Sequence, residues 1–386
     1  MSKIWPFSLN FLCFAAVAFS MPFVVLYYQS VGFDGTQIGL IMGLTPLVTL
    51  VSAPLWTGLA DATRRHRLLM SAALLVGACS IALLPSLTTF LPILLLALVF
   101  STAFAPVSSF IDSATMFMLG QEKQMYGRIR VGGTLGFGLA ATLAGVLVQN
   151  YGLKVAFWGA GILYLGALVL SQKLVHRPAQ EMTRPRAGAR TLLMNRHWLF
   201  FLALAFAGGL SLAVTNNYLF PYMKQLGSDE TTMGLALTAG TLSEIPVLFF
   251  GNRLIQRFHA RGLLLLAMIL TGIRLLAFSL VNAPGLVLLL QLLNGPTFPA
   301  MWLAGVAYAD EHAPAGMRAT AQGLFSAMVF GFGMAVGSLI GGPLLESLGG
   351  HTLFLVFGVL VLAVVLLVVL LESRLPAPQQ TLPEPP

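Results

Sequence analysis

The sequence predicts an all-α integral membrane protein with twelve transmembrane helices in two pseudo-symmetric six-helix bundles, and three observations support this prediction. Hydrophobic residues make up 57% of the 386-residue chain and charged residues only 9%, whereas soluble domains carry about 25% charged residues. Apolar runs of about 20 residues, the length that spans a bilayer, follow one another along the whole chain. The second half of the chain also repeats features of the first half.

The apolar runs define the expected helices in order. The predicted membrane segments are residues 5–29, 36–60, 68–88, 91–118, 128–149, 153–174, 198–222, 231–251, 262–282, 285–308, 318–345 and 351–371. The first segment is too long for a signal peptide and lacks a clear small-residue cleavage site, so it is interpreted as the first membrane helix. Prolines inside the segments predict kinks, which membrane helices tolerate; they are Pro46, Pro54, Pro106, Pro246 and Pro299.

A long basic link after the sixth segment divides the chain. It predicts a first six-helix bundle at 1–175, a cytoplasmic linker at 176–196, a second bundle at 197–373 and a disordered proline-rich cytoplasmic tail at 374–386. A shift of 197 residues places Gly136, Gly145, Gly152, Phe157 and Gly161 on Gly333, Gly342, Gly349, Phe354 and Gly358. This match indicates an internal repeat. Parallel six-helix repeats hold their solute site near the membrane midplane, between the two halves.

The distribution of positive charge predicts the orientation. The chain has a formal net charge of +8, but with a cytoplasmic N-terminus 18 of its 21 Lys and Arg residues face the cytoplasm. This positive-inside bias explains the basic composition without nucleic acid and places both termini in the cytoplasm, in a plasma (inner) membrane. The six histidines lie in loops or at helix ends, and Cys13 and Cys79 form no metal-ligand spacing. We therefore expect no metal, no cofactor and no enzymatic site, and nothing requires more than a monomer.

Four charged residues fall within or at the edge of apolar segments, where a charge costs roughly 2.5–3.5 kcal/mol on insertion scales. They are Asp112, Arg130, Glu244 and Arg274. In the stretch "YGRIRVGGTLGFG", Arg128 and Arg130 are two residues apart and cannot share a helix face. Arg130 follows Asp112 by 18 residues, a spacing that an antiparallel helix pair would bring to similar depth. Such a pair could bind a polar solute or act as a switchable ion pair; alternatively, both arginines are membrane anchors and Asp112 caps a local bend.

Glu244 is the strongest single candidate for carrying a proton, because it lies mid-helix with no basic neighbour in sequence. Arg274 on the next helix could neutralise it, and a static structural pair of the two remains the alternative. Further polar and aromatic side chains could hydrogen-bond to a solute or stack on it, although each one taken singly is more often a packing residue; they are Asn216, Asn217, Gln291, Asn294 and Trp302.

The chain resembles the major facilitator superfamily over its whole length. The stretch "PLWTGLADATRRHR" after the second segment is similar to the cytoplasmic signature of that family. The resemblance implies a charged latch that holds the cytoplasmic gate shut, made of Asp61, Arg64, Arg65 and Arg67. The match departs from the signature at Thr57, Ala62 and Arg64, which weakens the expected latch.

The stretches "YGRIRVGGTLGFG", "SEIPVLFF" and "QLLNGPTF" resemble the branch that contains lactose permease, the nucleoside–proton symporters and the phenylpropionate permeases. The resemblance to lactose permease implies that Arg130 and Asp112 bind the solute, that Arg274 matches the helix-9 Arg, and that Glu244 matches the helix-8 acid with a displacement of about one turn. Asn294 and Thr297 stand where lactose permease has a His and a Glu. Any proton coupling must therefore depend on Glu244 or Asp112.

These features together predict a secondary active transporter, with proton-coupled symport of a small polar organic solute (a sugar, a nucleoside or an aromatic acid) as the first hypothesis. The expected partners are that solute, protons and the lipid bilayer. A proton-driven efflux antiporter is the alternative within transport; the antiporter motif is absent from the fifth segment, although "GGPLL" occurs in the eleventh. A non-transporting receptor or enzyme is the alternative outside transport.

Overall fold

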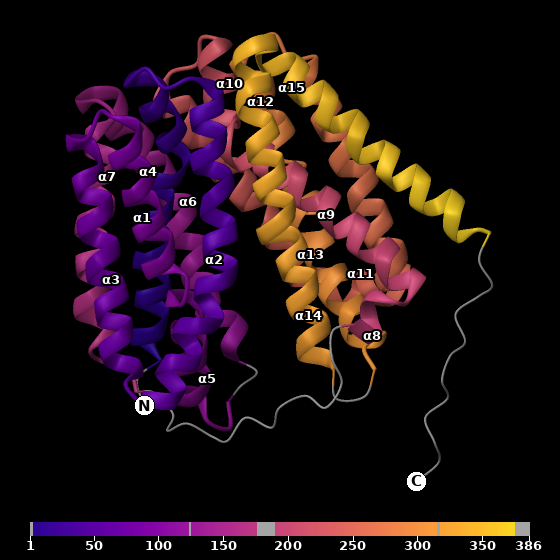
Figure 1. Ribbon diagram of the computed structural model, residues 1–386, viewed down its shortest axis with the longest axis horizontal. Coiled ribbons are helices and arrows are strands. Elements are labelled where there is room, and N and C mark those ends of the chain that lie inside the picture. Colours follow the sequence, from indigo (N-terminus) through magenta and orange to yellow (C-terminus); the bar gives the residue numbers. More distant parts are fainter. Residues whose placement is uncertain (1–2, 123–124, 176–189, 315–316, 375–386) are drawn as a thin grey trace.

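The computed structural model describes residues 3–122, 125–175, 190–314 and 317–374. Within these ranges the chain is helical and contains no strand. Figure 1 shows the helices of the first half (indigo to magenta) on one side and those of the second half (rose to yellow) on the other. We call the end of the molecule that holds the start of α1 (Ile4–Ser30) the proximal end, and the opposite end, where the chain turns from residue 30 to residue 35, the distal end.

The helices follow the apolar runs. In the first half, α1 is followed by α2 (Gly35–Thr63), α3 (His66–Leu83), η1 (Leu84–Ser86), α4 (Phe90–Phe104), α5 (Val107–Leu119), α6 (Tyr126–Tyr151) and α7 (Lys154–Ser171). The second half contains α8 (Arg190–Leu193), α9 (Arg196–Asn217), α10 (Leu219–Gln225), α11 (Glu230–Ser279), α12 (Pro284–Gln291), α13 (Asn294–Glu311), α14 (Arg318–Ser326), η3 (Ala327–Gly333, a π-helix) and α15 (Met334–Glu372). Of the predicted linker and tail, only residues 190–196 and 374 are described.

Ten helical stretches of the described chain are long and apolar enough to cross a membrane. Two of them are much longer than one crossing requires: α11 has 50 residues, and the run from α14 to α15 has 55. At 1.5 Å per residue, α11 would be about 75 Å long if straight, against about 30 Å for a bilayer core. Both runs contain a residue with non-helical backbone angles, His259 (φ 56°) in α11 and Gly349 (φ 78°) in α15. The chain therefore changes direction inside each run.

Three predicted segments are observed as two helices each, and one of the three breaks lies at a predicted proline kink. The predicted segment 91–118 breaks at Ala105–Pro106, because the proline ring has no N–H for the helix and fills the space of the preceding turn. The segment 198–222 breaks at Tyr218, and the segment 285–308 breaks at residues 292–293. Discontinuous membrane helices expose polar backbone groups and commonly border a solute site.

The internal repeat predicted from the glycines recurs as contacts between side chains. In the first half, the Tyr27 ring packs on Phe157 with ring centroids 5.2 Å apart. In the second half, Tyr222 packs on Phe354 with centroids 5.0 Å apart. The hydroxyls of both tyrosines donate to backbone carbonyls at the distal end: Tyr27 to Leu87 at 2.8 Å, Tyr222 to Phe278 at 2.6 Å.

Two further features repeat, the first at the shift of 197 residues and the second at a shift of 195. Gly152 and Gly349, which the shift of 197 residues superimposes, both have positive φ (86° and 78°), a conformation that favours glycine. The helices α2 and α11 both begin after an aspartate whose carboxylate caps the first turn, accepting from Gln37 N and from Thr232 N at 2.7 Å. The repeat is therefore carried by conformation and contacts as well as by residue identity.

The two halves meet along two seams toward the distal end. In the first seam, α6 packs on the start of α11; a Cβ added to Gly145 would overlap the Glu230 carbonyl, and Thr231 N donates to Gln149 Oε1 at 3.3 Å. Glycine allows this close approach.

In the second seam, α2 packs on α15. A Cβ added to Gly342 would overlap the Gly35 carbonyl, and Gly35 N donates to Glu346 Oε2 at 2.7 Å. The two seams use equivalent positions of the repeat, but one is closed by an amide side chain and the other by a carboxylate.

Candidate functional site

A hydrogen-bonded network surrounds Arg274 inside the second half. Arg274 lies on α11 and is 4% exposed. Its guanidinium donates from Nη1 to Asn294 Oδ1 at 2.8 Å and to Thr297 Oγ1 at 3.1 Å, and from Nη2 to Gln291 Oε1. It also lies over the Phe278 ring, with Cζ 5.3 Å from the ring centroid. A buried guanidinium needs acceptors for its donors, and each of these three acceptors is neutral.

The break between α12 and α13 supplies those acceptors. Gln291 is the last residue of α12 and Asn294 is the first residue of α13, so the interruption between them turns both side chains toward Arg274. The break itself packs tightly on α11, because a Cβ on Gly295 would overlap the Ser243 carbonyl. Ser243 Oγ also accepts from Gly295 N at 2.9 Å. The network therefore depends on how α13 sits against α11.

Glu244 joins this network through Asn294. Asn294 Nδ2 donates to Glu244 Oε1 at 2.7 Å. No ion pair within 4.0 Å joins Glu244 to Arg274 among the described residues, so the amide of Asn294 lies between the carboxylate and the guanidinium. The direct Glu244–Arg274 pair considered as a structural alternative is thus replaced by a bridged arrangement.

A second charged pair lies between α5 and α6 in the first half. Arg130 Nη1 donates to Asp112 Oδ1 at 3.0 Å, and both side chains are partly exposed. The guanidinium also faces the Phe14 ring of α1, with Cζ 5.7 Å from the centroid. The pair across the helix hairpin is the contact that the 18-residue spacing predicts. Arg128, two residues earlier, is exposed.

The close packing of α6 on α11 relates the two charged sites. A Cβ on Gly138 of α6 would contact the Thr241 side chain of α11 at 3.5 Å. Toward the proximal end, Arg130 lies about 12 Å along α6 from Gly138. In the same direction, Glu244 lies about 5 Å along α11 from Thr241. Both charged groups therefore lie on the proximal side of the α6–α11 seam.

A cavity of about 460 Å³ lies among α1, α2, α3, α4 and α5 and extends to the second half. Its lining is mostly apolar, and no Asp, Glu, Lys or Arg of the described chain contributes to it. Hydroxyl groups provide most of its polar atoms, from Ser20, Thr45, Thr49, Ser80, Ser101 and Ser108. Ser108 precedes Asp112 by one helical turn, so this side of the cavity leads toward the Asp112–Arg130 pair. The volume lies in the range of small-molecule sites.

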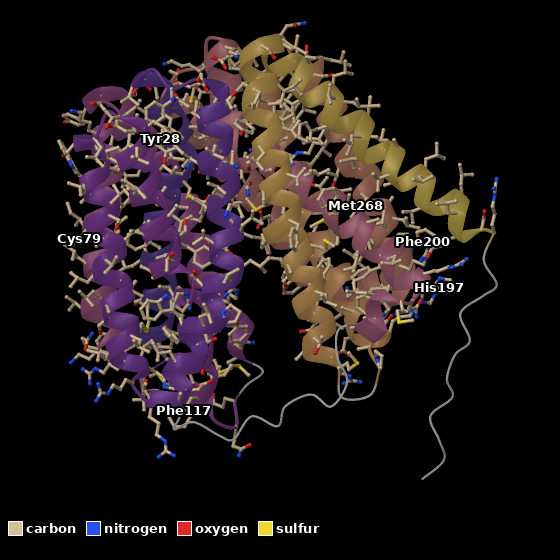
Figure 2. All side chains as sticks on the ribbon, viewed as in Figure 1. Tyr28, Cys79, Phe117, His197, Phe200 and Met268 are labelled. Carbon is tan, nitrogen blue, oxygen red and sulfur yellow. The ribbon has the colours of Figure 1, made fainter. Side chains whose placement is uncertain are left out.

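The second half contributes three residues to this cavity, Asn217, Phe330 and Met334. Figure 2 shows Tyr28, another lining residue, within the first half toward the distal end. Phe330 also contacts Phe298, with ring centroids 6.5 Å apart, and Phe298 lines a small pocket beside Arg274. This ring contact therefore joins the lining of the large cavity to the lining of the pocket beside Arg274.

The other predicted solute-binding residues have varied surroundings. Asn217 is buried and donates from Nδ2 to Ser338 Oγ at 2.8 Å, whereas Asn216 is exposed. Trp302 packs on Phe325 and Phe330, with centroids 5.1 and 5.0 Å away. Asn217 thus reaches the cavity directly, while Trp302 supports the aromatic wall that contains Phe330.

The predicted gate residues lie at the turn from α2 to α3. Asp61 Oδ1 and His66 Nε2 are 2.9 Å apart, and Arg67 Nε donates to Gln172 Oε1 at 2.8 Å. Both contacts stay within the first half. Arg64 ends α2 in the left-handed conformation (φ 57°), and Arg65 is exposed at the start of α3. A latch made by these residues stays a prediction.

Sequence reasoning overlooked two aromatic residues near Arg130. Phe14 faces the guanidinium from α1, and Tyr126 lies one helical turn before Arg130 on α6. The four-residue spacing of Tyr126 and Arg130 was a usable signal. The position of Phe14 was not, because it depends on how α1 packs against α6.

No cluster of three or more His, Cys, Asp or Glu side chains within the described ranges could hold a metal ion. Cys13 is buried and Cys79 is exposed on α3, at the outer edge of the first half (Figure 2).

Comparisons with known proteins agree with this architecture. A family model described as "MFS_1 like family" matches residues 7–356. The maltose permease of Geobacillus stearothermophilus is 31% identical over 372 residues, which cover 94% of this chain and 93% of that protein. The putative nucleoside transporter YegT of Escherichia coli (strain K12) is 24% identical over 340 residues, which cover 84% of this chain and 80% of that protein. The crystal structure of the nucleoside transporter NupG superimposes with a TM-score of 0.86 at 18% identity, covering 97% of this chain and 100% of that one.

Proposed function

Because the chain belongs to the MFS_1-like family, whose matching relatives are membrane transporters and not enzymes, we propose that it couples the uptake of a small polar organic solute to protons. Multi-pass membrane insertion and a small-molecule substrate follow from that membership. The proton, the direction of transport and the class of solute are our proposal. Sugars, nucleosides and aromatic acids are the solute classes to test.

The topology completes the proposal. We count α11 and the run from α14 to α15 as two crossings each, which turns the ten apolar stretches into twelve crossings. The repeated tyrosine contacts and the repeated positive-φ glycines support two related six-helix bundles, divided by the linker 176–196. The excess of Lys and Arg assigns the proximal end and both termini to the cytoplasmic side of an inner membrane. We propose a monomer.

The bridged network of Glu244, Asn294 and Arg274 is the observation that carries the proposal. A carboxylate at this depth of a membrane helix is costly and is kept where it has a function. Glu244 is partly accessible and is hydrogen-bonded by an amide, so a proton can reach it without breaking a direct ion pair. We assign Glu244 as the group that carries the transported proton, with Asp112 as the second candidate.

The solute site in this proposal lies between the halves. The cavity of about 460 Å³ holds the body of the solute, and its hydroxyl groups and Asn217 supply hydrogen bonds. The Arg130–Asp112 pair, which presents both donors and acceptors, binds a hydroxyl or carbonyl group of the solute. In alternating access, the two distal seams open while the proximal ends of the two halves come together. Asp61 and the neighbouring arginines then act as the latch that holds the proximal end closed.

Proton-driven efflux is the second candidate, and the apolar lining of the cavity favours it. An efflux antiporter exchanges solute against protons, whereas a symporter moves both in the same direction. The sign of the pH gradient that drives accumulation therefore separates the two functions.

The experiment starts with a thermal-shift screen of sugars, nucleosides and aromatic acids on the purified protein. With a ligand in hand, reconstituted vesicles are given a pH gradient, and uphill uptake is compared with solute exchange. Glu244→Gln should abolish proton-driven accumulation and leave exchange measurable, because the amide keeps the shape of the carboxyl group but cannot take up a proton.

Glu311→Gln, the same change in an exposed acid at the proximal end of α13, is the control and should accumulate normally. Normal uphill uptake by Glu244→Gln would contradict the assignment of the proton to this residue. Accumulation driven only by the opposite gradient would establish efflux.

A further inference from the structure

One amide links the only two charged groups of the Arg274 network within the described chain. Asn294 accepts from Arg274 Nη1 through Oδ1 at 2.8 Å and donates to Glu244 Oε1 through Nδ2 at 2.7 Å. A guanidinium can only donate and an ionised carboxylate can only accept, so this orientation of the amide is the one that satisfies both neighbours. The orientation of Asn294 therefore depends on the charge of Glu244.

Arg274 has donor capacity left over. Its Nε is buried and has no acceptor among the described residues. Beside the guanidinium lies a small pocket of about 20 Å³, whose lining includes the hydroxyls of Ser211, Thr215 and Thr271. Each of these three hydroxyls donates to a backbone carbonyl of its own helix, so its oxygen is free to accept. The pocket has room for about one water-sized group.

We propose that Asn294 is a positioning residue that transmits the protonation state of Glu244 to Arg274. The proposal rests on the assignment of the transported proton to Glu244. When the carboxyl group takes up a proton, it gains an O–H donor, and the oxygen of Asn294 is an acceptor in the amide already bonded to it. Rotation of the amide gives Glu244 this acceptor and withdraws it from Arg274.

The rotation leaves the Arg274 guanidinium without the acceptor that Asn294 Oδ1 provides. Its released Nη1–H must find another oxygen, and the solute or the water-sized pocket can supply one. Loss of the proton returns the amide to the orientation described above. The arrival of a proton is thus converted into a hydrogen-bond donor offered to the solute, without any direct contact between Glu244 and Arg274.

The surroundings of Glu244 support the choice of Arg274 as the partner. The helix α13 presents Asn294 and Gly295 to this part of α11, and neither is charged. The helix α6 approaches α11 at Gly138 and Thr241. The charged residue of α6 nearest to this contact is Arg130, about 12 Å along the helix from Gly138. Arg130 is already paired with Asp112.

A hydrophobic carbodiimide tests the relay without any solute, because it modifies a carboxyl group in its protonated form. Labelling of Glu244 in the purified protein is measured by mass spectrometry over a pH series, in a cycle of wild type, Arg274→Gln, Asn294→Leu and the double variant. In the presence of Asn294, loss of the cation should move the pH of half-maximal labelling upward by about one unit. In the Asn294→Leu background, the same change should produce little further shift.

Gln291→Leu is the matched control, because Gln291 also accepts from Arg274 but does not contact Glu244. It should leave the labelling midpoint unchanged and preserve the full effect of Arg274→Gln. An equal effect of Arg274→Gln with and without Asn294 would overturn the relay and leave a simple through-space interaction.

If Arg274→Gln does not fold, the single variants decide. The relay requires a shifted midpoint in Asn294→Leu and an unshifted one in Gln291→Leu, and equal midpoints would refute it. The readout is a titration in the absence of transport, so failure of the relay is distinct from failure of the proposed proton coupling, which uphill uptake measures.

Discussion

Two arginines of α6 have different surroundings although only one residue separates them. Both side chains are exposed, but among the described residues only Arg130 has an ion-pair partner, Asp112, and a facing ring, Phe14. A helix rotates by about 200° over two residues, which explains why they cannot share an environment. The same rotation decides which of them can reach a solute between the two halves.

We expect Arg130→Lys to lower solute affinity about tenfold or more, because an ammonium group cannot reproduce the planar fork that bonds Asp112 and a solute at once. Arg128→Lys should retain binding, because an exposed anchor needs only its positive charge. Binding of the screened ligand to the two purified variants decides the matter. Equal losses would reject the division of roles, and intact binding in Arg130→Lys would remove Arg130 from the site.

The tyrosine hydroxyls at the distal end offer a test of stability at the same scale. Tyr222 is buried and its hydroxyl donates to the Phe278 carbonyl at the end of α11. Tyr222→Phe should lower the free energy of unfolding by about 0.5–1.5 kcal/mol, because it removes a buried hydrogen bond while Val281 N still donates to the Phe278 carbonyl. Denaturant unfolding in detergent measures the change. Tyr151→Phe, at a ring that is 72% exposed, is the control and should unfold like the wild type.

At the scale of helices, hydropathy predicted where most membrane segments begin and end but did not predict their breaks. The expected segment 128–149 is observed as α6, Tyr126–Tyr151, because a bilayer-sized apolar run has a strong preference for one helix. The break at residues 292–293 leaves no mark in the hydropathy, since Leu292 and Leu293 are as apolar as the helices they separate. Its local signal is Pro296, which has no N–H to donate to the Leu292 carbonyl, and the close packing of Gly295 on Ser243 adds to it.

The same distinction holds for the candidate site. The Asp112–Arg130 contact could be predicted because it joins neighbouring helices of one hairpin at a fixed spacing. The position of Asn294 between Glu244 and Arg274 could not, because it depends on the α11–α13 contact and on the break before α13. The spacing of residues in the sequence predicts contacts within one helix hairpin. A hydrogen bond between helices that are distant in the sequence depends on tertiary packing, which no short motif predicts.

At the scale of the whole molecule, the two seams between the halves hold the distal end together. A Cβ at Gly342 would overlap the backbone of Gly35, so this seam closes only with glycine. We expect Gly342→Val to separate α2 from α15 and to open the cavity toward the distal side. A cysteine placed at Ser20, in a protein whose native Cys13 and Cys79 are replaced by serine, reports the opening through labelling by a membrane-impermeant maleimide.

Labelling from the distal side should be several times faster in Gly342→Val than in its parent. Gly323→Val is the matched control, because a Cβ at Gly323 in α14 would meet nothing within 4 Å. Unchanged labelling in Gly342→Val, with the fold retained, would mean that the glycine contact does not close the distal side.

The two seams occupy equivalent positions of the repeat, but the hydrogen bonds that join them differ in charge. The α6–α11 seam is tied by the neutral amide of Gln149, and the α2–α15 seam by the carboxylate of Glu346. Two halves that are nearly copies in shape are thus joined by two contacts of unequal charge, so the force that holds them together is not shared evenly between the seams.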